Sequence, residues 1–255
     1  MKNIFDTHAH YDDEAFHEDR FELLQSIHEQ NVELILTCGC NIPSSVAACE
    51  LAEKFPFIYF AAGFHPEEEK ESTAEDLEKI AELLRHEKCV AVGEIGLDYY
   101  WEDCCPRALQ KERFCQQIEM AKTFNLPVIV HDREAHGDTL DILRHYQPKG
   151  VVHCFSGSVE MAREIVKLGM YIGMGGVATF KNARRAVEVL RDIPADRLLL
   201  ETDAPYLAPV PLRGKRCDSS MIAYTAAAIA DIRGTDAQEL IDITNENGKR
   251  LFHIR

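Results

Sequence analysis

Short runs of apolar, largely β-branched residues alternate along the chain with longer segments whose apolar residues recur every three or four positions. The short runs predict eight buried strands: Ile4–His8, Val32–Thr37, Ile58–Gly63, Cys89–Glu94, Pro127–His131, Gly150–His153, Met170–Met174 and Leu198–Asp203. The longer segments predict amphipathic helices, among them Glu75–His86, Pro106–Phe124, Asp138–Tyr146, Val159–Leu168 and Ala183–Arg191. Alternation of strand and helix is typical of crossover units, so the pattern predicts a parallel sheet.

Eight such units within about 200 residues fit a closed (β/α)8 TIM barrel of the α/β class more simply than the alternative, an open doubly wound sheet. An open sheet that binds a dinucleotide would carry a G-x-G-x-x-G turn, and the glycines of Gly173–Gly176 lack that spacing. No linker divides the sequence, because the prolines of 205–211 lie in a predicted loop after the eighth strand. We therefore expect residues 1–255 to form one domain, closed by helices over 220–230 and 236–251.

Acidic residues outnumber basic ones along the 255-residue chain by 43 to 28, which gives a formal charge of −15. Such a chain has no general electrostatic attraction to nucleic acid or to an anionic membrane, so a phosphate-bearing substrate would need metal ions or a small basic patch. The N-terminus becomes charged by Asp6, which leaves no apolar core for a signal peptide, and no segment approaches the roughly 18 apolar residues of a membrane span. We expect a cytoplasmic protein without a membrane partner, and a monomer.

The nine cysteines are predicted to be reduced thiols without a shared role. Their odd number cannot pair completely, and the close pairs Cys38–Cys40 and Cys104–Cys105 lack the C-x2-C spacing of a structural zinc site.

Ionisable residues gather where the predicted strands end. They are Asp6, His8 and His10 at the first strand, Glu94 at the fourth, His131 at the fifth, His153 at the sixth and Asp203 at the eighth. In a parallel barrel the carboxyl ends of all strands open on the same face, so residues far apart in sequence meet there. Four imidazoles and two or three carboxylates are therefore predicted to share one pocket.

The histidines of this pocket predict a metal site. In extended backbone His8 and His10 point the same way and could hold one ion together, although this pair alone would as readily be two surface histidines. His131 and His153 at equivalent strand ends change that balance, because four imidazoles without a metal would be hard to keep buried and neutral.

Two carboxylates complete the predicted ligand set. Glu94 and Asp203 each follow a run that should be buried, where a charge needs a partner; the alternative is a surface carboxylate at a strand end. One carboxylate can bridge two ions about 3.5–4 Å apart, which suits Glu94. Glu201 lies two residues before Asp203 and could support the ligands from behind.

Six segments distributed in order along the chain make it similar to the metal-dependent TatD deoxyribonucleases of the amidohydrolase-like barrels. They are Phe5–His10, Gly63–Pro66, Val92–Tyr99, Pro127–Ala135, His153–Ser158 and Glu201–Leu207. The resemblance implies metal binding by His8, His10, Glu94, His131, His153 and Asp203. It also implies that Asp203 takes the proton of the attacking water, and that His65 and Arg133 lie on the substrate side near the phosphate. Without the resemblance, the His65–Pro66 turn would as readily be structural.

One departure from the family pattern concerns substrate binding. The basic run Pro211–Arg216 is present, but Cys217–Ser220 stands where such sequences usually continue with Asn-Glu-Pro. Arg213, Lys215 and Arg216 follow the eighth strand on the predicted active face and could bind a phosphodiester backbone; the alternative is a solvated loop that balances an acidic surface.

The predicted reaction is hydrolysis of a phosphodiester by metal-activated water, with one or two divalent ions as cofactors and Glu94 and Asp203 as catalytic groups. Imidazole ligands suit Zn²⁺, Mn²⁺, Fe²⁺ or Ni²⁺. The resemblance instead implies Mg²⁺-supported removal of nucleotides from a 3′ end, with DNA as the substrate, as single strands or 3′ ends. Two alternatives stay open: hydrolysis of a small ester, lactone, amide or phosphoester on the same barrel, and a noncatalytic metal-binding or interaction protein.

Overall fold

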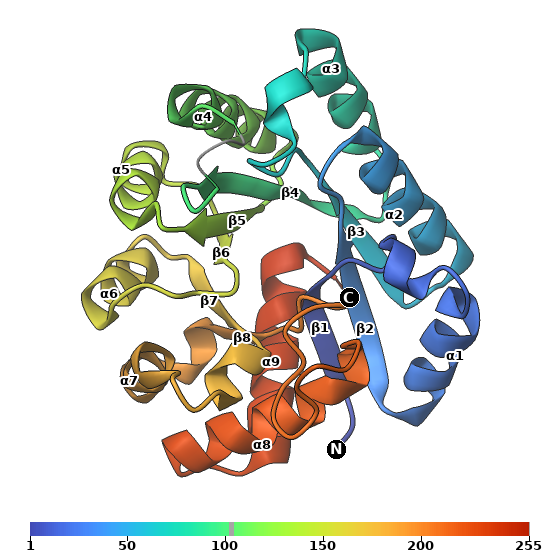
Figure 1. Ribbon diagram of the computed structural model, residues 1–255, viewed down its shortest axis with the longest axis vertical. Helices are drawn as coiled ribbons and strands as arrows, with labels where there is room; N and C mark the ends of the chain where they lie inside the picture. Colours follow the sequence, from blue (N-terminus) through green and yellow to red (C-terminus); the bar gives the residue numbers. More distant parts are fainter. Residues whose placement is uncertain (102–104, 255) are drawn as a thin grey trace.

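The computed structural model describes residues 1–101 and 105–254, so Cys104 of the second close cysteine pair lies outside the described residues. The described chain forms one parallel sheet whose strand order follows the sequence, ringed by helices (Figure 1). The strands are β1 (Ile4–Ala9), β2 (Val32–Cys38), β3 (Ile58–Ala62), β4 (Cys89–Asp98), β5 (Val128–Arg133), β6 (Gly150–Val152), β7 (Tyr171–Met174) and β8 (Leu198–Leu200). The predicted (β/α)8 TIM barrel is confirmed.

Nine α-helices connect and close the strands within the described ranges. They are α1 (Arg20–Gln30), α2 (Ile42–Lys54), α3 (Ala74–Leu83), α4 (Arg107–Phe124), α5 (His136–Tyr146), α6 (Val159–Lys167), α7 (Arg184–Asp192), α8 (Ile222–Arg233) and α9 (Ala237–Phe252). Polar side chains fix several starts: Asn41 caps α2, Ser158 caps α6, and Asp236 accepts from the N–H groups of Gln238 and Glu239 in α9. Among these helices, none has the length and apolar character needed to cross a bilayer.

The barrel closes between β8 and β1. The Thr7 hydroxyl donates to the Leu200 carbonyl over 3.0 Å, and the His10 N–H donates to the Ala204 carbonyl over 2.7 Å. A single parallel bridge pairs Ala9 with Ala204. The two ends of the predicted ligand set, from β1 and from the segment after β8, are thereby held side by side.

Two strand boundaries differ from the sequence prediction. β4 does not end at Glu94 but continues to Asp98, because it stays paired with β5 as far as Asp98 and Arg133. The β4–β5 register shifts between Val92 and Ile95, so Glu94 lies at an irregularity inside the strand. β8 is shorter than predicted and ends at Leu200. Asp203 therefore belongs to the loop beyond β8.

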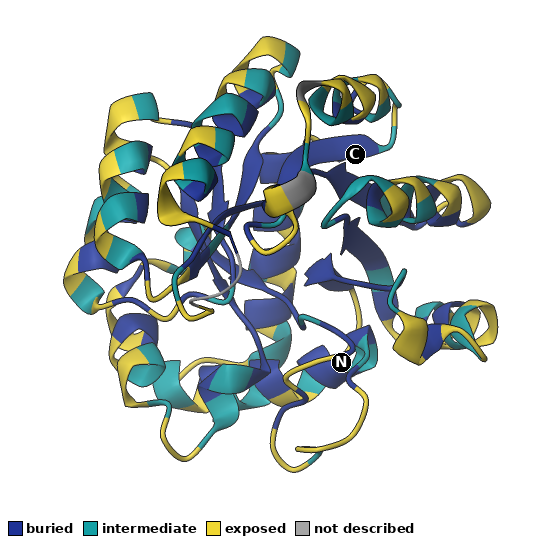
Figure 2. Ribbon diagram, turned by 45° about the horizontal axis from the view of Figure 1, so that its top comes forward, coloured by how far each residue is buried: buried dark blue, intermediate teal, exposed yellow. Residues whose placement is uncertain are grey.

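Burial separates the inside of the barrel from its outer layer (Figure 2). One apolar cluster takes residues from every strand, such as Phe5, Leu36 and Leu199, and includes Phe252 at the end of α9. The Phe5 and Phe252 rings meet edge to face, with centroids 6.2 Å apart. The interior is thus a packed core, and the last turn of α9 covers it at the end opposite the predicted site.

We predict that Asn247→Ala lowers the free energy of unfolding by about 1–3 kcal/mol, because Asn247 ties α9 to the start of β8. Its side chain is 1% exposed, and Nδ2 donates to the carbonyls of Ala195 (2.8 Å) and Leu198 (2.9 Å). Urea denaturation followed by circular dichroism measures the change. Glu246→Ala, at the exposed neighbour, should stay within about 0.5 kcal/mol of the wild type. Equal stability of the two variants would show that the hydrogen bonds of Asn247 to the start of β8 do not stabilise the fold.

Candidate metal centre

The six predicted ligands meet at the carboxyl ends of the strands. His8 lies in β1 and His10 just after it, Glu94 in β4 and His131 in β5, while His153 and Asp203 follow β6 and β8. Their ligand atoms form overlapping groups within 4.8 Å of one another. His65, which follows β3, joins them, since its Nε2 lies 3.7 Å from Glu94 Oε1.

One group surrounds the Oε2 atom of Glu94. The Nε2 atoms of His8 and His10 are 3.0 Å apart and lie 3.2 and 3.4 Å from Oε2. Asp203 Oδ1 lies 3.7 Å from His8 Nε2 and 3.4 Å from His10 Nε2. These four side chains point their donor atoms at a common space.

A second group surrounds the Oε1 atom of Glu94. His153 Nε2 is 2.7 Å and His131 Nδ1 is 2.8 Å from Oε1, and these two nitrogens are 3.5 Å apart. Glu94 is therefore placed between two sets of imidazoles, with one carboxylate oxygen turned to each.

The donor set fits divalent ions. Two ligand atoms that each lie about 2.1 Å from one ion are about 3.0–3.4 Å apart when their bonds make angles between 90° and the tetrahedral value. Around Oε2 the 3.0, 3.2 and 3.4 Å separations lie in this range, and the 3.7 Å separation of His8 Nε2 from Asp203 Oδ1 lies just above it. Around Oε1 the 2.7 and 2.8 Å contacts are shorter and have the length of hydrogen bonds. Imidazole nitrogens with a shared carboxylate are also the ligand chemistry of paired transition-metal sites. The residues present fit one ion at Oε2 by both distance and ligand type, and the imidazoles at Oε1 are of the type that could hold a second.

The charges of the cluster are mutually dependent. Burial opposes the charged form of Glu94, but the imidazoles of His153 and His8 outweigh it and hold the pKa of Glu94 well below its usual range. Burial likewise disfavours protonation of His131, yet its hydrogen bonds to Asp98 and Glu94 raise its pKa to about 10. The pocket therefore stabilises anionic carboxylates against positive charge, which is the field that a bound cation would satisfy.

Backbone and side-chain acceptors orient the imidazoles from behind. His10 Nδ1 donates to the Cys38 carbonyl over 3.0 Å, which leaves Nε2 free to face the cluster. His131 is turned the other way, because its Nε2 donates to Asp98 Oδ2 over 2.9 Å and its Nδ1 faces Glu94. Asp98 is 1% exposed, and sequence reasoning gave it no role. A carboxylate four residues after Glu94, on the same strand, was the available signal.

Asp203 is held in the loop beyond β8 by a network anchored on Asp6. Asp6 Oδ2 accepts from the Thr202 hydroxyl over 2.7 Å, and Oδ1 accepts from the Thr202 N–H over 3.0 Å. Asp203 adopts a left-handed backbone with φ of 76°, and its N–H donates to the His8 carbonyl over 3.0 Å. Asp6, at the first predicted strand end, thus supports the cluster without facing it.

Three further residues contact the histidines. The thiol sulfurs of Cys38 and Cys40 lie 3.4 Å from His8 Nδ1 and 3.6 Å from His10 Nδ1, and Cys40 belongs to one of the groups of potential ligands. The sequence analysis predicted no shared role for the cysteines, whereas the structure places both of these thiols beside the histidines of the cluster. Glu201, predicted to support the ligands, accepts from the Cys154 N–H and lies 3.9 Å from His153 Nδ1.

The predicted substrate-side arginines have different surroundings. Arg133 Nη1 is 4.0 Å from Asp98 Oδ2, so this side chain borders the cluster. Arg213 lies over the Phe180 ring, 3.8 Å from its centroid. Arg216 forms two hydrogen bonds to the Asp19 carboxylate, of 2.7 and 2.6 Å, and donates to the Ala15 carbonyl. Arg216 is thus engaged in tying its loop to the start of α1.

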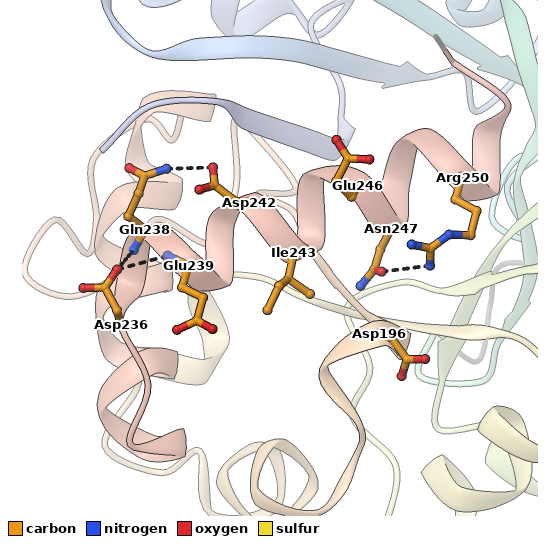
Figure 3. Close-up of a pocket in the computed structure, with 9 residues that line it drawn as sticks. All are labelled: Asp196, Asp236, Gln238, Glu239, Asp242, Ile243, Glu246, Asn247 and Arg250. Atoms are coloured by element: carbon orange, nitrogen blue, oxygen red, sulfur yellow. Dashed lines mark hydrogen bonds between the residues drawn. The ribbon is translucent and has the colours of Figure 1, made fainter.

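The groove along α9 lies away from this cluster. It reaches Asp196, just before β8, and is therefore at the amino-terminal end of the barrel (Figure 3). Its lining is mostly acidic and consists of Asp196, Asp236, Gln238, Glu239, Asp242, Ile243, Glu246, Asn247 and Arg250. An acidic groove would repel a phosphate-bearing ligand, so the cluster at the mouth of the barrel is the better candidate for binding one.

Comparisons with known proteins point to one family. A model described as TatD related DNase matches residues 5–253. An uncharacterized metal-dependent hydrolase of Bacillus subtilis, YabD, is 46% identical, over 98% of this chain and 99% of that protein. A 3′-5′ ssDNA/RNA exonuclease TatD of Citrobacter koseri is 34% identical, over 98% and 99%. The crystal structure of YjjV, a TatD homologue from Escherichia coli, superposes with a TM-score of 0.93 at 32% identity and covers 99% of each chain.

Proposed function

Because the chain belongs to the TatD-related DNase family of metal-dependent hydrolases, we propose that it cleaves phosphodiester bonds of DNA, removing nucleotides from the 3′ end of single strands. The observation that carries the proposal is the position of Glu94 between two groups of imidazoles at the barrel mouth. The exonuclease name of one relative supports the substrate class.

In this proposal Glu94 would hold the metal together with residues on both sides of its carboxylate. His8, His10 and Asp203 would serve on the Oε2 side, and His131 and His153 on the Oε1 side. Zn²⁺, Mn²⁺, Fe²⁺ or Ni²⁺ suit these imidazole-rich sets, and Mg²⁺ is the ion of the family resemblance. When bound, divalent ions make water nucleophilic near neutral pH and offset the charge of the phosphodiester.

The two carboxylates have different parts in the reaction. The Asp203 side chain is 20% exposed and that of Glu94 is 3% exposed, so Asp203 is the one that solvent can reach. Asp203 therefore accepts the proton of the attacking water, whereas Glu94 keeps the two groups of ligands in register. His65, Arg133 and Arg213 bind the substrate; His65 lies within the cluster, 3.7 Å from Glu94, and Arg133 borders it, 4.0 Å from Asp98.

The test compares substrate classes after the bound metal has been removed and single divalent ions have been added back. On 3′- and 5′-labelled single-stranded DNA we expect stepwise shortening from the 3′ end, at a kcat/KM well above that for a panel of small esters, lactones, amides and phosphoesters. If the protein hydrolyses the small substrates and leaves the DNA uncleaved, it is a hydrolase of small molecules and not a nuclease. A metal-loaded protein that cleaves neither class would be a noncatalytic metal-binding protein.

Asp98→Asn is expected to weaken metal binding by about 10–100-fold. The Asp98 carboxylate keeps the proton of His131 on Nε2, so that Nδ1 is available to the ion, and an amide lacks the charge that does this. Competition with a chromophoric chelator measures the affinity. Asp132→Asn is the matched control: Asp132 also accepts from a histidine, His136, over 2.8 Å, but this pair is outside the cluster. Equal affinities in both variants would show that Asp98 does not orient His131 for metal binding.

A further inference from the structure

Large exposed apolar side chains gather at the mouth of the barrel. Among the described residues there are nine of them, and five lie in the loops after β4 and β8: Tyr100, Trp101, Tyr206, Leu207 and Val210. Tyr100 and Trp101 are adjacent and each is 51% exposed. Exposed apolar surface concentrated beside a candidate active site indicates a binding surface rather than scattered exposure.

The two aromatic rings of the β4 loop form an ordered surface with a cation. Their centroids are 4.8 Å apart and their planes are nearly perpendicular, at 88°. The Arg133 guanidinium lies 3.8 Å from the Tyr100 centroid and 5.6 Å from that of Trp101. These three side chains could bind both parts of a nucleotide, because an aromatic ring can stack on a base and a guanidinium can bind a phosphate.

This surface is joined to the candidate metal centre by short contacts. The Tyr100 N–H donates to Asp98 Oδ1 over 2.9 Å, while the other oxygen of Asp98 accepts from His131. Arg133 directly follows Asp132 in β5 and lies 4.0 Å from Asp98. A phosphodiester at the metal centre would therefore place a neighbouring nucleotide beside the rings.

We propose that Trp101 stacks against an unpaired base of a single-stranded nucleic acid whose scissile phosphate lies at the metal centre, and that Tyr100, packed edge to face against it and covered by Arg133, holds the Trp101 ring in place. This inference rests on the proposed function and adds a determinant of substrate class to it. Bases inside a duplex have both faces covered by their neighbours, whereas a single strand exposes them. Stacking also provides affinity that does not depend on charge, which suits a chain with a net charge of −15.

Trp101 is the only tryptophan of the chain, so its fluorescence reports on this surface directly. The metal-loaded protein is titrated with a nuclease-resistant phosphorothioate oligonucleotide, and with the same strand carrying abasic sites in place of its bases. We expect the base-containing strand to quench the emission in a saturable way and the abasic strand to leave it unchanged. Quenching by neither strand, with binding of both seen by fluorescence polarisation, would overturn the stacking surface.

Kinetics provide the second measurement. In the wild type, kcat/KM for a single strand should exceed that for its abasic counterpart by about 10–100-fold, mainly through KM. Trp101→Ala and Tyr100→Ala should each remove much of this difference, and Trp101→Phe should restore it. Tyr224→Ala, which removes a 46% exposed ring of α8, is the matched control and should behave as the wild type.

The outcomes separate this inference from the function on which it rests. If the wild type cleaves base-containing and abasic strands equally well, the proposed nuclease function stands and the proposed base stacking is excluded. If no strand is cleaved, the nuclease proposal fails, and the fluorescence titration alone decides whether the rings bind bases. If Trp101→Ala lowers kcat/KM equally for base-containing and abasic strands, Trp101 supports the structure and does not bind bases.

Discussion

Glu94→Gln is expected to lower kcat/KM for hydrolysis by about a thousandfold or more and to release the bound metal, with the barrel still folded. Glu94 Oε1 faces His131 and His153, and Oε2 faces His8 and His10. A glutamine has one acceptor oxygen, so its amide NH2 would replace a ligand oxygen on one side of the cluster. The substitution also removes the negative charge that both groups of imidazoles face, so both candidate ion sites change through a single, nearly isosteric substitution.

Metal content by mass spectrometry and kcat/KM on labelled single-stranded DNA are measured on the same preparations, and circular dichroism checks the fold. Glu246→Gln makes the same change at an exposed position in the α9 groove, at the other end of the barrel, and should retain both metal and activity. If Glu94→Gln kept wild-type metal content and rate, Glu94 would not bridge the ions, and the proposed site would lose its central ligand.

The barrel and the gathering of the histidines at its mouth could be predicted from the sequence because both depend on strand ends. Runs such as Val32–Thr37 and Leu198–Leu200 are buried on both faces, which is the pattern of parallel strands. Once the strands are parallel, the geometry of the barrel brings His131 and His153 to the same mouth as His8.

Other features depend on contacts between strands that the sequence does not encode locally. Glu94 turns inward at a register shift, where its N–H donates to the carbonyl of Gly39 beyond β2. The role of Asp98 depends on which nitrogen of His131 faces Glu94, and that follows from the β4–β5 pairing. Tyr100 and Trp101 could be noticed only once the structure showed them exposed beside Arg133. Periodicity locates strand ends, whereas side-chain orientation at those ends needs the folded neighbours.

Asp203→Asn is expected to lower kcat by about 10²–10⁴-fold while most of the bound metal stays in place, which distinguishes it from Glu94→Gln. Burial opposes the charged form of Asp203, but its hydrogen bond to His10 holds the pKa of Asp203 below its usual range, so the carboxylate is ionised and able to accept a proton. An asparagine retains an oxygen ligand but cannot accept that proton. His8, His10 and Glu94 remain to bind the ion.

The same metal analysis and single-turnover kinetics on labelled DNA test this difference, with Asp196→Asn, at an exposed position before β8, as the control that should match the wild type. Loss of metal in parallel with activity would make Asp203 a ligand without a role in proton transfer. A wild-type rate in Asp203→Asn would assign the proton to another group. A slow, metal-loaded enzyme is the result that separates binding from catalysis, because Asp203 then contributes to the reaction itself rather than to holding the ion.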